Sequence, residues 1–275
     1  MTDSAIRLIG AAELTLAEAL DLLRRGTLDL EGRLAEASNI TMRAFITADG
    51  RKARCVYKPV QGERPLWDFP DGTLAGREVA AYLVSAATGW DIVPPTVLRG
   101  GPAGTGACQL WIDGDDSDEL LGFVPVDDLP ADWHSIASAR GPDGERFVLA
   151  HAPDDRLARM AVFDVVINNA DRKGAHVVCG TDGRVHGVDH GVSFHAEDKL
   201  RTVLWGWAGH DLPADITDTL RSLRDGLSGD LAEQLHEHLT IREVAATAER
   251  VDRLLSAGRY PMPGDDWPAL PWPPI

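Results

Sequence analysis

The stretch NNADRKGAHVV, residues 168–178, places two amides, an aspartate, two cations and a histidine between an apolar helical pattern and an apolar strand pattern. The pattern before it predicts a buried helix, and HVVCGTDGRVHGVD after it predicts two strands joined at Asp182-Gly183. Asp171 then follows the helix and Asp189 ends the second strand, so the two loop ends can meet in space. Polar density beside apolar elements usually costs stability, so the segment is either a well-solvated turn or a site of chemistry.

Composition limits what the chain binds. Its 275 residues are enough for one large domain or two small ones. Forty-three acidic against 27 basic residues give a net charge of −16, which disfavours nucleic acid and anionic membrane surfaces as partners. With no apolar run of about 18 residues and no basic-then-apolar N-terminus, we expect a soluble cytoplasmic protein without stable membrane association. Cys55, Cys108 and Cys179 lie in apolar strand-like runs, which predicts buried thiols rather than disulfides.

Periodicity in the first 112 residues predicts a small sheet with two helices. Thr15 and Glu18 form a capping-box pattern at the start of the first helix, and Gly89 can end the second. Asp49-Gly50 is a hairpin turn signal between two short β-like runs. The predicted elements are a helix at 15–26, antiparallel strands at 27–58, a helix at 77–89 and a hairpin at 96–112.

The acidic stretch at 113–119 indicates a break between two lobes, an N-terminal lobe of residues 1–112 and a C-terminal lobe of residues 113–275. We expect the second lobe to be mostly helical apart from the one hairpin that follows Asp171. The proline-rich tail at 260–275 cannot form regular helix and is expected to strap the domain. Helical periodicity recurs at 212–225, 230–239 and 241–257.

The charged residues around the opening motif have the spacing that phosphoryl transfer requires. That reaction needs an aspartate to orient the acceptor hydroxyl, a metal ligand five residues on, and a second carboxylate on the metal. Asp171, His176 and Asp189 match these three requirements. The alternative is that Asp171 makes an Asx-turn after the helix and that Asp189 caps a backbone amide.

Upstream, Lys58 ends the predicted sheet, and Glu78 follows twenty residues later on a predicted helix. A strand lysine held by a helix glutamate is the arrangement found in kinases. On a helical wheel Glu78 lies at the edge of the apolar face formed by Val79, Tyr82 and Leu83, so its carboxylate points inward. Taken singly, Lys58 and Glu78 fit ordinary solvated residues, but the order and spacing of all the elements favour the functional interpretation.

The motifs ASN, YKPV, REVAAYL, CQLWI, NNADRKGAH and VDHG, in this order, resemble the phosphatidylinositol 3- and 4-kinase-related, kinase-like proteins, and more distantly the HipA-type protein kinases. The resemblance covers roughly residues 27–200. It implies an α+β, bilobal protein-kinase-like fold, with a small N-terminal β-rich lobe and a larger, mostly helical C-terminal lobe. ATP, with Mg²⁺ or Mn²⁺, would bind between the lobes.

The resemblance also implies roles for single residues. Asp171 would be the catalytic aspartate, and Asp189 would replace the metal-binding aspartate of the kinase DFG motif. Lys173 stands where Ser/Thr protein kinases carry a lysine and would neutralise the γ-phosphate, whereas His176 replaces the usual metal-binding asparagine. The implied nucleotide contacts are the phosphate-covering turn Ala37, Ser38 and Asn39, the phosphate ligand Lys58 with its partner Glu78, and the hinge residues Gln109, Trp111 and Ile112.

We therefore expect an ATP-dependent phosphotransferase of the atypical kinase type, whose acceptor is a protein or the chain itself. A lipid kinase approaches an anionic surface, where each nearby Lys or Arg contributes about 1 kcal/mol, and a chain of net charge −16 without a basic cluster is unsuited to this. The rival hypothesis is a pseudokinase that binds nucleotide as a regulatory scaffold. Its basis is His176 together with the glycine-poor phosphate loop.

Two further interpretations concern polar residues near the motif. Asn168 and Asn169 fit a simple helix end, because asparagine tolerates left-handed backbone angles. A zinc hydrolase would use His176 with His186, His190 and His195. Strand alternation disfavours it, because His186 and His190 share a face but His195 lies beyond the strand.

Overall fold

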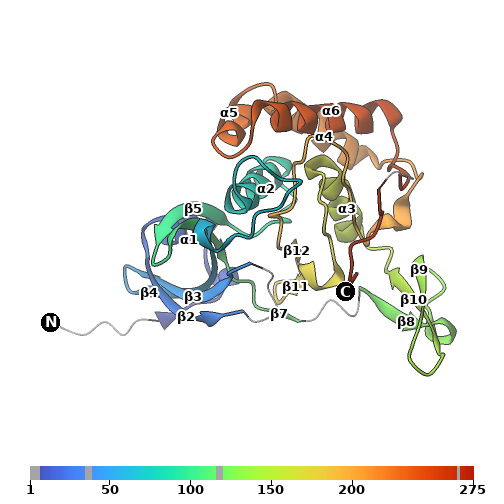
Figure 1. Cartoon of the computed structure of the whole chain (residues 1–275), viewed down its shortest axis with the longest axis horizontal. Helices are drawn as coiled ribbons and strands as arrows, with labels where there is room; N and C mark the ends of the chain where they lie inside the picture. The colour runs from blue at the N-terminus through green and yellow to red at the C-terminus, as the bar shows by residue number, and fades with distance from the viewer. Residues whose placement is uncertain (1–6, 35–38, 116–119, 265–266) are drawn as a thin grey trace.

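The first half of the chain forms a six-stranded sheet in the order β2-β3-β4-β6-β5, with the short β1 pairing parallel to β4. The computed structural model describes residues 7–34, 39–115, 120–264 and 267–275. In Figure 1 the sheet lies on the left and curves around α1. The strands are β1 (Arg7–Leu8), β2 (Thr27–Arg33), β3 (Met42–Ala48), β4 (Arg51–Pro59), β5 (Thr96–Gly101) and β6 (Gly104–Leu110).

The helix cap and the hairpin turn that the sequence predicted for this part of the chain are both present. Helix α1 (Leu16–Arg25) starts with a capping box, in which the Glu18 amide donates to Thr15 Oγ1 at 3.3 Å and the Thr15 amide donates to Glu18 Oε2 at 3.0 Å. The turn between β3 and β4 holds Asp49 and Gly50 at φ of 49° and 74°. Alternate residues of β4 are buried in the sheet core, so Lys58, out of phase with them, faces the opposite side.

Two of the three cysteines lie in the core of this sheet. Cys55 on β4 and Cys108 on β6 are both 0% exposed, whereas Cys179 is only partly buried. All three are free thiols. A hydrogen bond from Cys108 and burial together raise the pKa of the Cys55 thiol far above its usual range. The predicted burial of the cysteines is thus confirmed for Cys55 and Cys108, and only in part for Cys179.

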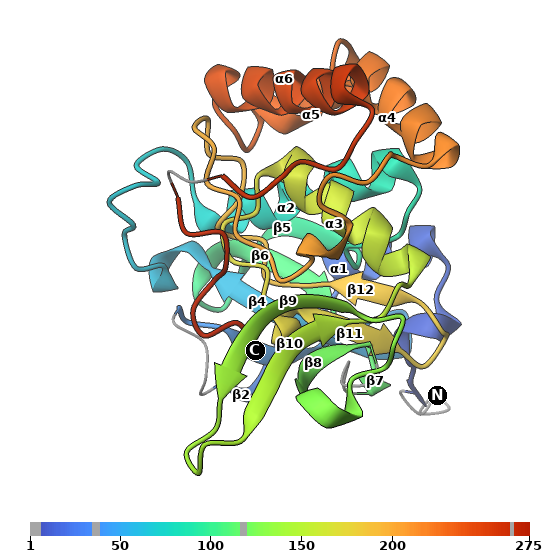
Figure 2. The same ribbon diagram turned by 90° about the vertical axis from the view of Figure 1, so that its right-hand side faces the viewer.

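Helix α2 (Leu74–Thr88) joins the sheet to the helical part of the molecule. Thr73 caps its N-terminus, and Gly89 ends it with a left-handed φ of 67°. The helix packs on β5 and β6 and also on α4 and α5, and its Ala80 and Ala81 belong to the same core cluster as the helices that follow. Figure 2 shows α2 lying between the strands and the layer of C-terminal helices.

The second half is built around the buried helix α3, whose Phe163 and Met160 are fully enclosed. Helices α4, α5 and α6 form a layer over α2 and α3, as Figure 1 shows. The helix and hairpin predicted around the opening motif are confirmed. No helix in the described ranges is long and apolar enough to cross a membrane. The elements are α3 (Asp155–Ile167), β11 (Val177–Gly180), β12 (Val185–Gly187), α4 (Ala214–Gly226), α5 (Asp230–His236) and α6 (Ile241–Ala257).

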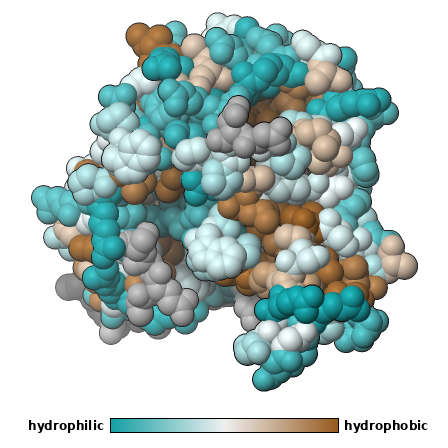
Figure 3. Space-filling view, turned by 45° about the vertical axis from the view of Figure 1, so that its right-hand side comes forward, coloured by the Kyte–Doolittle hydropathy of each residue, from teal (hydrophilic) through white to brown (hydrophobic). Residues whose placement is uncertain are grey.

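A three-stranded sheet, β8-β10-β9, projects from the second half and was not predicted. The expectation of one hairpin there was wrong, because the apolar runs at 120–126 and 147–150 form strands of this sheet. The base of the sheet is buried at Leu121 and Leu149. Phe123 is 43% exposed, and Figure 3 shows apolar side chains gathered above the hydrophilic tip at the lower right. The strands are β8 (Leu121–Pro125), β9 (His134–Arg140) and β10 (Arg146–His151), while β7 (Gly114–Asp115) pairs with β11.

The proline-rich tail runs back over the body of the protein, as predicted. The carbonyl of Ala269 accepts the backbone amide of Thr202 at 3.1 Å and the indole N–H of Trp205 at 2.9 Å. Further on, the carbonyl of Pro274 accepts the amide of Gly174 at 2.8 Å. These bonds carry the tail to the loop that follows Asp171, and the C label lies beside β11 in Figure 1.

Candidate functional site

A cavity of about 640 Å³ lies between the strands of the first half and the 174–189 region of the second. Its volume is within the usual range of ligand sites, about 300–1,000 Å³. One side of it is lined by Lys58 and the predicted hinge residues Gln109, Trp111 and Ile112. The opposite side carries His176 and Asp189. The Gln109 amide is tied to β5, since its Nε2 donates to Thr96 Oγ1 at 2.8 Å.

Lys58 stands between two carboxylates at the inner end of this cavity. Its ammonium donates to Glu78 Oε1, and it lies 2.8 Å from Asp189 Oδ1. Burial alone would lower the pKa of Lys58, but Asp189 and Glu78 together hold it above its usual range. The ammonium is therefore a fixed positive charge. The predicted strand lysine and helix glutamate do meet, and Asp189 joins them.

Glu78 is 2% exposed, as its inward position on the helical wheel predicted. Its second oxygen accepts the backbone amide of His190 at 3.1 Å, which ties α2 to the loop after β12. Burial raises the pKa of the Glu78 carboxyl, while Lys58 opposes this shift. One ammonium thus serves two carboxylates, which leaves the cluster of Lys58, Glu78 and Asp189 with a net negative charge that suits a divalent cation.

Asp171 faces a smaller cavity of about 70 Å³ that Lys58, Glu78 and Asp189 also line. Its carboxylate pairs with the ammonium of Lys173 at 3.2 Å. Burial raises the pKa of Asp171, with Lys173 opposing the shift, so its affinity for a proton is increased. The predicted catalytic pair Asp171 and Lys173 therefore lies beside the lysine and glutamate pair.

His176 is held so that one ring nitrogen faces the cavity. Its Nδ1 lies 2.8 Å from the Asp171 carbonyl, an acceptor that requires Nδ1 to carry the proton. Nε2 is then unprotonated and lies 3.5 Å from Asp189 Oδ2. Burial lowers the pKa of His176 to about 4, so the ring is neutral near pH 7. A histidine fixed through Nδ1 by a carbonyl is the usual preparation for metal binding through Nε2.

Asp189 has a left-handed backbone, with φ of 61°. This conformation costs free energy for a residue other than glycine, and such residues cluster at functional sites. The ammonium of Lys58 holds the pKa of Asp189 well below its usual range. Its side chain is still 55% exposed toward the cavity, so the carboxylate is ionised and accessible.

The pair of His176 and Asp189 fits a cation that takes most of its ligands from phosphate and water. Magnesium typically uses one or two protein carboxylates in this way. Among the described residues there is no group of three or more His, Cys, Asp or Glu side chains that could hold a metal alone. The other histidines of the motif are engaged elsewhere: His190 Nε2 lies 2.6 Å from the Arg172 guanidinium, and His195 Nδ1 accepts the Glu197 amide at 2.9 Å.

A buried network around Arg172 was missed by the sequence analysis. Arg172 and Asp164 are both fully buried and form an ion pair of 3.0 Å. The same guanidinium donates to the carbonyls of His176 and Val188 at 3.1 and 3.2 Å, so it fixes the loops that carry both candidate metal ligands. The available signal was Asp164, a lone carboxylate in an apolar helix, which requires a buried partner.

The neighbouring amides serve this network rather than the cavity. Asn168 ends α3 with a left-handed φ of 51°, as predicted, and its Nδ2 donates to the carbonyls of His195 and Glu197. Asn169 Oδ1 accepts the Asp171 amide at 3.0 Å and thereby positions the catalytic loop. No contact with the 640 Å³ cavity is found for either amide.

The predicted phosphate-covering turn is described only in part. Ala37 and Ser38 lie outside the described residues. Asn39 Oδ1 accepts the backbone amide of Arg64 at 2.8 Å, and the residue lines the small cavity with Asp171. Asn39 is therefore near the expected phosphate position.

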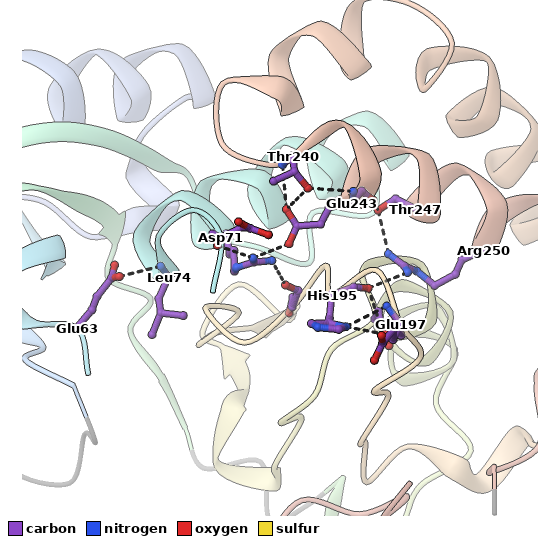
Figure 4. Close-up of polar contacts among 12 residues, drawn as sticks. Glu63, Asp71, Leu74, His195, Glu197, Thr240, Glu243, Thr247 and Arg250 are labelled. Carbon is purple, nitrogen blue, oxygen red and sulfur yellow. Dashed lines mark hydrogen bonds and ion pairs between the residues drawn. The ribbon is translucent and has the colours of Figure 1, made fainter. Parts of the chain in front are cut away.

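Helix α2 is anchored at the site by a second buried ion pair that the sequence analysis also missed. Arg77, next to Glu78, pairs with Glu243 of α6 at 2.5 Å, and the two side chains are only 1% and 8% exposed. The same guanidinium donates to the carbonyls of Ser193 and Asp71 at 2.7 and 2.9 Å. Figure 4 shows Glu243 near Asp71, with Thr240 capping the start of α6 above them.

The arrangement of a β-rich part and a helical part is similar to that of solved kinase structures. The Golgi casein kinase with Mn/ADP bound matches 88% of this chain and 75% of its own, with a TM-score of 0.54 and 14% identity. The structure of hydra Fam20 with sugar matches 94% of this chain and 91% of its own, with a TM-score of 0.53 and 14% identity. The predicted bilobal, kinase-like α+β fold is confirmed.

A relative of higher identity shows the family. The chain is 50% identical over 261 residues to Protein Rv2133c of Mycobacterium tuberculosis (strain ATCC 25618 / H37Rv), which covers 92% of this chain and 94% of that protein. The chain belongs to the same family as Protein Rv2133c. No protein-family model matches it.

Proposed function

We propose that the chain is an ATP-dependent phosphotransferase of the atypical kinase type, related to the phosphatidylinositol 3- and 4-kinase-like proteins. In this proposal residues 1–112 form the N-lobe, residues 113–275 form the C-lobe, and the nucleotide lies in the 640 Å³ cavity between them. The adenine would contact the segment from Gln109 to Ile112, and the phosphates would reach Lys58.

One observation carries the proposal. The ammonium of Lys58 contacts both Glu78 and Asp189, three residues widely separated in sequence, and Asp171 lines the same small cavity. A fixed cation, its helix partner, a metal-binding carboxylate and a hydroxyl-orienting carboxylate are the parts that phosphoryl transfer needs. In a purely structural ion pair the carboxylate of Asp189 would not need to be accessible, yet the side chain is 55% exposed.

The chemistry follows from the positions of the groups. The acceptor oxygen forms a bond to the γ-phosphorus as the bond from that phosphorus to the β-phosphate oxygen breaks, and ADP leaves. The hydroxyl proton goes to Asp171, whose raised pKa favours its uptake. Lys58 and Lys173 offset phosphate charge on either side. A divalent metal held by Asp189 and His176 would neutralise charge between the β- and γ-phosphates.

A solved structure of similar fold supports the cofactor in this proposal, and the net charge of the chain supports the acceptor. The Golgi casein kinase was crystallised with Mn and ADP, which supports nucleotide with Mn²⁺ or Mg²⁺ here. We propose a protein, or the chain itself, as acceptor, because a net charge of −16 disfavours an anionic lipid surface. The accessible, ionised Asp189 favours an active enzyme over a pseudokinase.

The test uses γ-labelled ATP with pure protein and each divalent metal, and mass spectrometry then maps the labelled residues. Asp171→Asn is expected to bind Mg-ATP normally but to transfer no phosphate. Asp189→Asn is expected to lose metal-dependent nucleotide binding as well, which titration calorimetry with a non-hydrolysable analogue measures. Nucleotide binding by the wild type without transfer to any acceptor would support the scaffold instead.

A further inference from the structure

The segment that follows the metal loop lies parallel to the catalytic loop. Arg172 and Thr202 form a parallel bridge, in which the Arg172 amide donates to the Arg201 carbonyl at 3.0 Å. Both bridged side chains point inward, because both bond Asp164. Successive residues of extended chains alternate in direction, so Asp171 and Arg201 lie side by side on the outer face.

Arg201 is displayed on that face by an aromatic ring. Its guanidinium lies 4.4 Å from the centre of the Trp267 ring, and Lys199, two residues earlier, lies 4.1 Å from the same centre. Trp67, which is 87% exposed, approaches the Lys199 ammonium at 5.9 Å. A ladder of alternating rings and cations, Trp67, Lys199, Trp267 and Arg201, therefore ends at Asp171. We call it the cation–aromatic ladder.

The positive charge of Arg201 acts on Asp171, where it favours the ionised carboxylate and opposes the effect of burial on the pKa. Lys199 has Asp68 at 3.9 Å, but no ion pair joins Arg201 to any residue in the described ranges. The Nε of Arg201 is buried without a hydrogen bond, and the residue as a whole is only partly buried. In a chain of net charge −16, an unpaired arginine beside the proposed catalytic aspartate needs a reason.

We infer that the cation–aromatic ladder selects an acceptor whose hydroxyl lies next to a carboxylate or phosphate, with Arg201 as the residue that binds this anionic group. The inference rests on the proposed phosphotransferase activity and adds the class of substrate. A planar guanidinium placed over an indole ring can offer its N–H groups for two parallel bonds to an anion. Lys199 adds a second positive charge over the same indole ring.

Lys173 and Arg201 would then act on different groups, the first on the transferred phosphoryl group and the second on the acceptor. Lys173, 3.2 Å from Asp171, stands on the catalytic loop and is available to the transferred phosphoryl group. Arg201, on the neighbouring segment, is available to the acceptor. When Asp171 takes the hydroxyl proton and the acceptor oxygen bonds to phosphorus, Arg201 holds the anionic neighbour of that oxygen in place against repulsion by the Asp171 carboxylate.

The experiment compares acceptors that differ only in charge near the hydroxyl. One set is peptides with a single serine flanked by glutamate, alanine or lysine, and the other is glycerate against glycerol. We expect kcat/KM for the glutamate peptide or for glycerate to exceed its neutral counterpart by about tenfold or more. The set that shows the preference identifies a protein segment or a small hydroxy acid as the source of the anion.

Variants separate recognition from folding. Arg201→Gln is expected to bring the acidic-to-neutral ratio close to one at unchanged affinity for Mg-ATP, and Arg201→Lys to retain part of the preference. Arg253→Gln, which removes an arginine paired with Asp198 on the surface of α6, is the matched control and should keep the wild-type ratio.

Two results overturn the inference while leaving the proposed function intact. The first is equal transfer to acidic and neutral acceptors by the wild type, a comparison that needs no variant. The second is an unchanged ratio in Arg201→Gln. Absence of transfer to every acceptor and to the chain itself would instead remove the proposed function, and the inference with it.

Discussion

The ammonium of Lys58 is shared by carboxylates from two distant parts of the chain, Glu78 and Asp189. We expect Lys58→Met to weaken nucleotide binding at least about tenfold, because the fixed counter-charge of the phosphates is lost from a cavity of low polarity. The thermal shift on adding Mg-ATP measures this. Lys52→Met is the control, since Lys52 lies on the same strand but against the ring of Phe45. A wild-type shift in Lys58→Met would make the lysine merely structural.

Metal preference tests the role of His176. Imidazole suits manganese better than magnesium, which prefers oxygen ligands, and Nε2 of His176 faces Asp189. We expect faster phosphotransfer with Mn²⁺ than with Mg²⁺ in the wild type, and a shift of this ratio toward Mg²⁺ of about tenfold in His176→Asn. Rates with each metal at saturating concentration give the ratio. If it does not change, His176 only fixes the loop through Asp171.

The sequence predicted the residues whose type and spacing are unusual. Lys58, Glu78, Asp171, His176 and Asp189 stand out because charged groups there interrupt apolar patterns, and the structure brings all five to one cavity system. Their roles remain proposals. Arginines with long-range partners could not be found in this way, because a buried arginine in a polar stretch has the same sequence signature as a solvated one.

At the scale of elements, α2 is held from both sides. Glu78 binds the lysine strand, and Arg77 binds Glu243 of α6. We expect Arg77→Met to lower the free energy of unfolding by about 3–5 kcal/mol, because Glu243 would be left as a buried charge without its partner. Urea denaturation measures the loss. Arg253→Met should cost far less, since the Arg253 and Asp198 side chains are 58% and 74% exposed.

A loss of stability in Arg77→Met as small as that in Arg253→Met would contradict this account of α2. The comparison also bears on activity, because displacement of α2 would move Glu78 away from Lys58. A variant that stays folded below its unfolding transition is therefore expected to bind nucleotide more weakly than Arg253→Met does.

Elements with a strong period or clear caps were predictable, and those that depend on tertiary packing were not. The capping box of α1, the Asp49-Gly50 turn and the Gly89 helix end are local signals, and each lies where it was expected. The β8-β10-β9 sheet carries polar residues and prolines along half-exposed strands. β9 and β10 form a hairpin, but β8 pairs with β10 across the intervening sequence of β9, and no local pattern specifies that pairing.

For the whole molecule, buried histidines predict sensitivity to acid. His151 shows the cause: its Nδ1 bonds the Ala152 carbonyl, its Nε2 accepts the Gly206 amide, and burial lowers its pKa to about 4. Such a ring takes a proton in the unfolded chain near pH 6.5 but not in the folded one. Burial lowers the pKa in the same direction for His134, His151, His176, His186, His190 and His238.

Stability should accordingly be complete above about pH 6.5 and fall as the pH decreases toward 4, because the unfolded state then binds more protons. His151 alone contributes roughly 3 kcal/mol to this loss, from the shift between 6.5 and about 4. Urea denaturation at a series of pH values tests it. If the free energy of unfolding stays level from pH 7 to pH 5, the folded and unfolded states bind the same number of protons over this range. The rings would then be protonated in the folded protein as readily as in the unfolded chain, and the prediction would be wrong.

The buried thiols of Cys55 and Cys108 allow the rate of local opening around them to be measured. Alkylating reagents react only with the thiolate, and Cys55 on β4 and Cys108 on β6 are buried in the core between the sheet and α1, with the Cys55 pKa raised. Their modification must wait until this core opens. With Cys179 replaced by alanine, the rate of labelling in native buffer therefore reports how often the core between the sheet and α1 opens.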